Sequence, residues 1–277
     1  MFSSQIVENS MNIVGSFYDY MFPSMIPLLI SIYMLIDTGL LYYLAYILQY
    51  ITIPLFRLNG YGALCILISI LTGFPFSTIL LCKFYKEQKI SKRELYVILC
   101  SFTLPSFSFI FTSIKNNLLP NTFTTLITHI YSLSLISTVT LSRMFLKRPK
   151  ITPIKEICTE SRKQFKKFNF PLSLAKNTES ITTSLAIILG TMVYFNIIST
   201  FINNILKTNY LLSGIIEFSL PSIIAAKNND LTGLRIILSF SSLSCFFQCS
   251  SILDENKLPS TPLIISKLSS TLISLLI

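Results

Sequence analysis

Two polar side chains lie inside apolar stretches of the chain, where burial of a polar group without a partner is costly. Glu217 lies in the run 211–226, LLSGIIEFSLPSIIAA, and Gln248 lies in the run 231–253. A carboxylate in such surroundings is costly unless it faces a cavity or finds a partner. Glu217 is therefore a candidate for proton or cation coupling or for binding a substrate hydroxyl, and a contact with a basic residue such as Lys267 is the structural alternative. Gln248 both donates and accepts hydrogen bonds, which suits a polar small molecule or a bond between helices.

Glycine and proline interrupt two of the apolar stretches. Gly73-Phe74-Pro75 divides the segment from Tyr61 to Cys82, and Ser219-Leu220-Pro221 divides the run 211–226. Backbone groups that leave a helix in lipid lose their partners, at a cost of several kcal/mol each. Such breaks are tolerated where they are buried in protein or line a polar cavity, as in transporters. The two breaks therefore indicate where function is concentrated.

Other polar residues near the apolar runs have two interpretations each. Ser77, Thr78 and Ser222 follow the breaks, where free amides of half-helices bind anions, but serine and threonine also serve structural roles. His129 is the only histidine and has no acidic neighbour in sequence, so a proton relay and plain packing are both open. Lys267 either counters an anionic substrate or extends to the membrane interface.

The chain has no pattern typical of an enzyme. Its six cysteines show no metal-ligand spacing, and it carries no Walker motif and no recognisable set of nucleophile, histidine and acid. We therefore expect no enzyme activity, no catalytic residue, no metal ligand and no cofactor.

The composition is that of a membrane protein. The 277 residues are 52% hydrophobic and only 12% charged, with a mean hydropathy of +0.65, whereas soluble domains carry about 25% charged residues. Segment 83–94 carries five basic and two acidic residues, and segment 143–176 carries ten basic and two acidic residues. Short basic connections between apolar runs are typical of cytoplasmic loops near anionic lipid. The expected partners are the lipid bilayer and a small-molecule substrate, and not nucleic acid.

The apolar runs predict an all-α polytopic membrane protein with a single membrane domain over 1–277. Their lengths lie near the ~20 residues that span a bilayer, so we expect about 7–9 membrane segments, two of them broken or re-entrant. Asp37, between the first two runs, is either a loop carboxylate at the membrane surface or an ion site. Ser91, with Glu94 three positions later, predicts a helix start.

An internal repeat is expected from the order of the segments. Cys100–Ser106 aligns with Leu238–Ser244, and each stretch follows a proline-broken apolar segment and a polar connection. We expect a first repeat at about 40–142, a basic loop at about 143–176 and a second repeat at about 181–277. The second broken run is short for a full span, at ~1.5 Å per helical residue against a core of ~30 Å, which favours re-entrant or half-helix geometry.

Several short motifs occur in a specific order and together carry a family resemblance. They are Phe22–Pro27, Pro54–Arg57, Gly60-Tyr61-Gly62, Gly73-Phe74-Pro75, Ser213–Glu217, Ser239-Phe240, Leu243-Ser244 and Gln248. In this respect the chain resembles the YlbJ/SpoVV family of sporulation integral membrane proteins. The nucleoside-recognition Gate domain of that family is similar to the one in concentrative nucleoside transporters.

The resemblance implies a transporter or permease for a small polar or anionic organic molecule, by analogy dipicolinate moved during sporulation. It implies a multi-pass protein of the cell membrane, in the mother-cell or outer forespore membrane. Substrate would bind between the two broken segments. The candidate substrate-binding residues are Gly73, Phe74, Pro75, Ser77, Thr78, Glu217, Ser219, Pro221, Ser244 and Gln248.

The chain also departs from the family pattern. The stretch 102–108 reads FTLPSFS and lacks the two asparagines that the family has there, Ser241-Ser242 replace a glycine pair, and Pro221 replaces another glycine. The chain is also shorter than usual members. These departures motivate the alternative function, a non-transporting membrane scaffold or assembly protein of the sporulation envelope.

Overall fold

The computed structural model describes residues 2–101, 104–206 and 209–276, and within them the chain forms helices and turns without strands. The all-α class is thus confirmed. The first half contains α1 (Phe2–Ser16), the π-helical turn η1 (Phe17–Met21), α2 (Phe22–Asp37), α3 (Leu40–Phe56), α4 (Gly60–Thr72), α5 (Phe76–Lys86), α6 (Lys92–Ser101), α7 (Phe107–Phe109), η2 (Ile110–Ile114), η3 (Lys115–Asn117) and α8 (Pro120–Phe145). The second half contains α9 (Ile154–Lys167), α10 (Phe170–Leu206), α11 (Tyr210–Ile216), α12 (Ser219–Lys227), α13 (Leu231–Phe240), α14 (Leu243–Glu255) and α15 (Thr261–Leu276).

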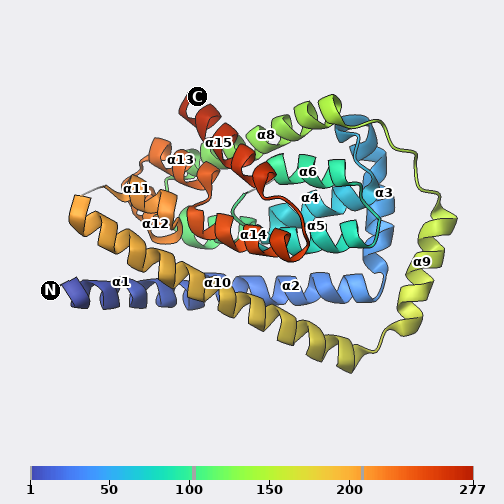
Figure 1. Ribbon diagram of the computed structural model, residues 1–277, viewed down its shortest axis with the longest axis horizontal. Helices are drawn as coiled ribbons and strands as arrows, with labels where there is room; N and C mark the ends of the chain where they lie inside the picture. Colours follow the sequence, from blue (N-terminus) through green and yellow to red (C-terminus); the bar gives the residue numbers. More distant parts are fainter. Residues whose placement is uncertain (1, 102–103, 207–208, 277) are drawn as a thin grey trace.

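Long helices enclose a group of short ones. The rod formed by α1, η1 and α2 and the long helix α10 lie against each other and run in opposite directions along the molecule (Figure 1). The short helices α4, α5, α6 and α11–α14 lie beside them, and α8 and α15 pack against α6 and α13. The short helices of the two halves follow the same order. In each half a break, a helix, a turn, a helix and a second break succeed one another.

The number of membrane spans is smaller than the sequence predicts. Three helical stretches of the described residues are long and apolar enough to cross a bilayer: Pro120–Phe145, Phe170–Leu206 and Leu231–Glu255. Two bent pairs raise the total to five if each is one span. The chain is accordingly a multi-pass membrane protein, but 7–9 spans are not confirmed, because the breaks divide other apolar runs into helices too short to cross alone.

One bent pair is the corner between α3 and α4, where the axes differ by 92°. Arg57 ends α3 in the left-handed conformation at φ +49°, and the Asn59 side chain accepts a hydrogen bond from the N–H of Gly62 at 2.9 Å. A Cβ on Gly60 would lie 2.3 Å from the carbonyl oxygen of Ala45, so only glycine lets the two helices approach this closely. As a result α3 lies across one end of the molecule (Figure 1).

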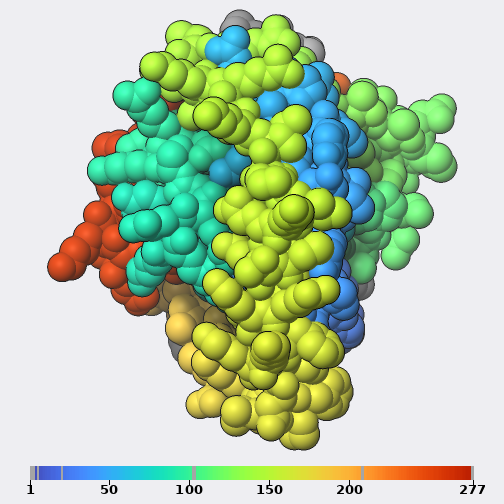
Figure 2. Space-filling view, turned by 90° about the vertical axis from the view of Figure 1, so that its right-hand side faces the viewer, coloured from blue at the N-terminus to red at the C-terminus, as the bar shows by residue number. Residues whose placement is uncertain are grey.

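Both basic connections lie at that same end. The Tyr61 hydroxyl, at the start of α4, donates a hydrogen bond of 2.7 Å to the Glu160 carboxylate on α9. The side-chain amide of Asn59 donates a hydrogen bond of 2.8 Å to the backbone carbonyl of Lys89, which lies in the first basic connection. Figure 2 views this end, where α9 covers the surface beside α3. The contacts agree with the prediction that the two connections share one side of the membrane.

Two local predictions have structural outcomes at this end. Ser91 and Glu94 form the predicted helix start, because the Ser91 hydroxyl accepts from the Glu94 N–H at 3.2 Å and the Glu94 carboxylate accepts from the Ser91 N–H at 2.8 Å. Asp37 accepts a hydrogen bond of 2.8 Å from the Asn177 side chain on α10. Asp37, the last residue of α2, thus has a structural partner on α10.

The placement of the basic connections makes a testable prediction. Lys92 and Lys163 are both exposed, and on a cysteine-free background Lys92→Cys and Lys163→Cys should both resist an impermeant thiol reagent in intact cells. Both should react once the membrane is permeabilised, because basic loops stay in the cytoplasm. The Asn59–Lys89 and Tyr61–Glu160 bonds together require the two connections to lie on one side of the membrane. Labelling of only one position from outside would contradict this arrangement.

Candidate functional site

The first break begins where α4 ends at Gly73. This residue has φ +63° and ψ −160°, and its N–H still donates to the Ser69 carbonyl at 2.9 Å. A Cβ at this position would lie 2.4 Å from the backbone nitrogen of Ser106. Glycine is required here for both the backbone angle and the close approach. The predicted break at Gly73-Phe74-Pro75 is therefore confirmed, and it packs directly against a second break at 104–106.

The break in the second half lies earlier than predicted. Helix α11 ends at Ile216 and α12 begins at Ser219, so Glu217 and Phe218 form the break. Ser219-Leu220-Pro221 instead form the first turn of α12. The predicted position is wrong because proline is tolerated in a first helical turn, where the backbone N–H lacks a helical partner anyway.

Two further breaks separate α6 from α7 and α13 from α14. The first includes Leu104-Pro105-Ser106, while Phe102 and Thr103 lie outside the described residues. The second is formed by Ser241 and Ser242, both at φ +56°. This is backbone that glycine adopts readily and serine rarely. The Ser242 hydroxyl nevertheless caps α14 by accepting from the Cys245 N–H at 3.3 Å.

All four breaks meet around one small cavity of about 20 Å³. Its lining includes Phe74 from the first break, Ser106 from the second, Phe218 from the third and Ser241 from the fourth. The rings of Phe109 and Phe218 meet edge to face with centroids 5.0 Å apart. The breaks of the two halves therefore form a single packed centre.

Glu217 lies in this centre and is only 1% exposed. Its Oε2 accepts hydrogen bonds from the N–H of Ser219 at 2.9 Å and from the Ser219 hydroxyl at 2.6 Å. The backbone amides of Phe218 and Leu220 also face the carboxylate. Its Oε1 has no hydrogen-bond partner of good geometry among the described residues. The start of α12 thus supports a carboxylate that keeps one oxygen for another partner.

Lys267 is 4% exposed and binds backbone carbonyls at the break between α13 and α14. Its ammonium group donates to the carbonyl of Phe240 at 2.7 Å and to that of Ser241 at 3.2 Å. These are carbonyls at the end of α13, which a cation stabilises. The interpretation of Lys267 as the partner of Glu217 is wrong, because the only ion pair among the described residues joins Lys89 to Glu87.

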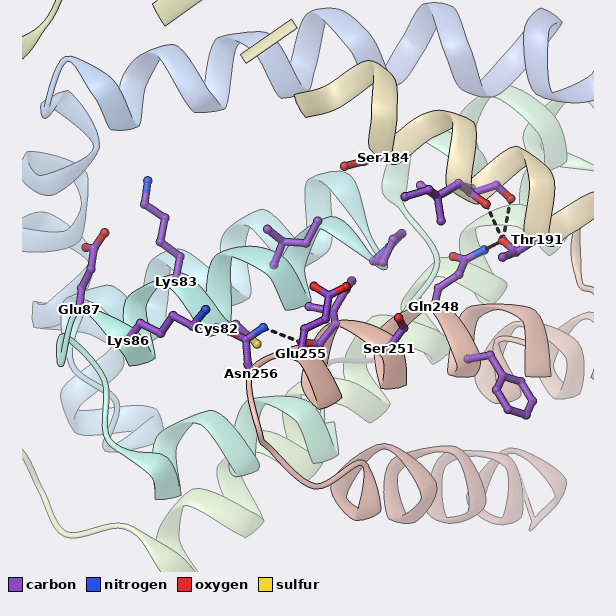
Figure 3. A pocket seen from close by; sticks show the side chains of 16 residues that line it. Cys82, Lys83, Lys86, Glu87, Ser184, Thr191, Gln248, Ser251, Glu255 and Asn256 are labelled. Atoms are coloured by element: carbon purple, nitrogen blue, oxygen red, sulfur yellow. Dashed lines mark hydrogen bonds between the residues drawn. The ribbon is translucent and has the colours of Figure 1, made fainter. Parts of the chain in front are cut away.

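Gln248 lies at the inner end of a groove of about 660 Å³ between α5, α10 and α14. Its amide donates to the hydroxyl of Thr191 on α10 and, at 3.5 Å, to that of Ser244. Gln248 therefore links α14 to α10 and also lines the groove. Figure 3 shows Thr191 and Gln248 at one end, and Lys83, Lys86 and Glu87 toward the other.

Some of the predicted site residues line the groove or the small cavity, and others are buried between helices. Pro75 and Gln248 line the groove, and Phe74 lines the small cavity. Ser77 and Thr78 are buried in helix packing, where Thr78 donates to the Cys249 sulfur at 3.5 Å.

The remaining candidates hold the breaks together. Ser219 bonds Glu217, and Ser222 donates to the carbonyl of Ser219 at 2.8 Å. Pro221 is buried in the first turn of α12.

The outer part of the groove is not predicted by the sequence. Lys83 and Lys86 were counted only as loop charges, and Thr191 lies far from Gln248 in sequence. No local pattern could have joined these residues, because three separate helices bring them together. His129 contacts the Ser274 hydroxyl at 3.4 Å, and no cluster of metal-ligating residues occurs within the described ranges.

The conformation of Ser242 makes a testable prediction. At φ +56° and ψ +159°, it lies in a region that costs a residue with a side chain about 1–3 kcal/mol. Ser242→Gly should relieve this strain and lose only a few tenths of a kcal/mol of capping, whereas Ser242→Ala keeps the strain and loses about 1 kcal/mol. Thermal unfolding of the purified protein should therefore rank glycine above alanine. Equal unfolding temperatures for the two variants would contradict the strained geometry.

Comparisons of the chain with protein-family models, with curated proteins and with solved structures give no match.

Proposed function

We propose that the protein is a membrane transporter or permease for a small polar or anionic organic molecule. The observation that carries the proposal is the meeting of four helix breaks around one cavity, with the buried residue Glu217 next to the lining residue Phe218 in the third break. Discontinuous helices at an interface between two halves are the usual construction of substrate and ion sites in secondary transporters. A carboxylate at such a place is a functional group by default.

The groove supplies a path from the basic end toward this centre. Lys83 and Lys86 line its outer part, and Pro75 and Gln248 line its inner part. Lys83 and Lys86 attract anions; of the two carboxylates that also line the groove, Glu87 pairs with Lys89 and Glu255 carries one compensating negative charge. Gln248 offers an amide to a polar group. Glu217 would then bind a substrate hydroxyl, a proton or a cation through Oε1, the oxygen without a described partner. This arrangement supports a polar or anionic substrate.

The family resemblance sharpens the proposal. By that resemblance the substrate is dipicolinate, the process is sporulation, and the broken segments belong to a nucleoside-recognition Gate domain. The cell membrane, as the mother-cell or outer forespore membrane, is the corresponding location. The two halves, with their common order of helices and breaks, would move against each other to open the centre to either side.

A second candidate is a membrane scaffold or assembly protein that transports nothing. The observation that favours it is the size of the central cavity, which at about 20 Å³ holds no substrate as it stands. Phe109 and Phe218 close it from the two halves. In a scaffold the breaks would serve rigid packing alone.

Transport assays on Glu217 variants test the proposal. In vesicles offered a panel of aromatic dicarboxylates and nucleosides, the wild-type protein should move at least one compound. Hydrogen bonds to a charged group are worth about 1.5–3 kcal/mol, so Glu217→Gln and Glu217→Ala should lower the rate by about tenfold or more. Both variants should stay in the membrane at near-normal levels.

The control is Glu179→Gln, which removes an exposed carboxylate on α10 and should leave transport unchanged. Normal transport by Glu217→Gln would reject a charged role for Glu217. No transport by the wild type across the panel, together with lower thermal stability of the Glu217 variants, would favour the scaffold.

A further inference from the structure

A second groove, separate from the one that leads to Gln248, lies between α6, α8 and α15. It has a volume of about 680 Å³ and a mainly apolar lining. Tyr96 and Cys100 come from α6, Leu141 and Phe145 from α8, and Ile265 from α15. Helix α8 is long and apolar enough to cross the bilayer. The groove lies beside the last turn of α8, at Leu141, Met144 and Phe145, and therefore borders the membrane at that end of the helix.

A small polar pocket of about 250 Å³ adjoins this groove. Arg93 and Phe145 line both spaces. Arg57 and Lys147 also line the pocket, which therefore holds three cationic side chains. The pocket lies at the basic end of the molecule, between the segments 83–94 and 143–176.

The pocket lining carries more positive than negative charge. Arg57 is held in place by donating to the carbonyls of Arg143 and Leu146, each at 3.1 Å. The side chains of Arg93 and Lys147 are exposed and make no hydrogen bond or ion pair with another described residue. The one carboxylate in the lining, Glu94, is already bonded to backbone N–H groups at both oxygens.

We propose that the pocket and groove together bind one anionic phospholipid. Its phosphate lies against Arg93 and Lys147, and an acyl chain lies along the groove between Tyr96 and Leu141. Charge complementarity selects an anionic headgroup, because basic pockets between transmembrane helices on the cytoplasmic side bind such groups. The adjoining apolar groove selects a lipid over a free anion, which would leave it empty. The site shares no residue with the groove at Gln248 and is independent of the proposed transport function.

Photo-crosslinking and native mass spectrometry of the full-length protein test the site. Phosphatidylglycerol with a photoactivatable acyl chain should crosslink to segments 96–100 and 141–145. One phosphatidylglycerol should be retained in preference to phosphatidylcholine. Removing both of these cations with Arg93→Gln and Lys147→Gln should lower that retention by about tenfold or more, because the phosphate loses both of its counter-charges.

The matched control is Lys150→Gln, which removes an exposed charge of the same basic segment that lines neither space and should leave retention unchanged. Cys100→Phe should reduce crosslinking by narrowing the groove while all three cations remain. Equal retention of the two lipids, or unchanged retention by the Arg93 and Lys147 double variant, would overturn the proposal. Displacement of phosphatidylglycerol by inorganic phosphate alone would instead identify a small-anion site.

Discussion

Backbone groups at the helix breaks must find partners away from water, and much of the fold follows from this requirement. An amide or carbonyl without a partner in an apolar interior costs several kcal/mol. Gly73 meets this constraint locally, because its N–H donates to the Ser69 carbonyl at 2.9 Å and its carbonyl accepts from the Ser77 N–H at 3.2 Å. Lys267 meets it by donating to the free carbonyls of Phe240 and Ser241. The break at Gly73 also packs against the backbone of Ser106, and Lys267 lies 27 residues from Phe240, so the breaks depend on distant parts of the chain as well as on their neighbours.

This mutual dependence explains why the short helices need a cover of long ones. Helices such as α11 and α12, of seven and nine residues, are too short to be stable alone. They are held by packing against α10, α13 and η2. The long helix α10 also receives the hydrogen bond from Gln248 to Thr191, which ties the inner end of the groove to the outer layer. The broken centre and its surrounding helices therefore stabilise each other.

The sequence predicts features that depend on near neighbours and misses those that depend on distant ones. The Gly73 break and the helix start at Ser91 have local chemical signals, and both are found in the structure. The break at Glu217 was placed too late because Pro221 fits a helical turn as well as a break. The prediction of 7–9 membrane segments is not confirmed, because apolar length says nothing about helix direction, and the axes of α3 and α4 differ by 92°. The partners of Lys267 were missed because they lie 26 and 27 residues away.

The way the two buried charges are satisfied bears on whether the centre can move. Glu217 is supported by amides at the start of α12, and Lys267 by carbonyls at the end of α13. Each charge is thus balanced by the helix end beside it, without an ion pair across the centre. Separating the halves would therefore break the contact between Phe109 and Phe218 without leaving either charge unpaired in an apolar interior, which is the costly outcome. A centre built this way is closed, and opening it would break no buried salt bridge, which suits the alternating access that we propose.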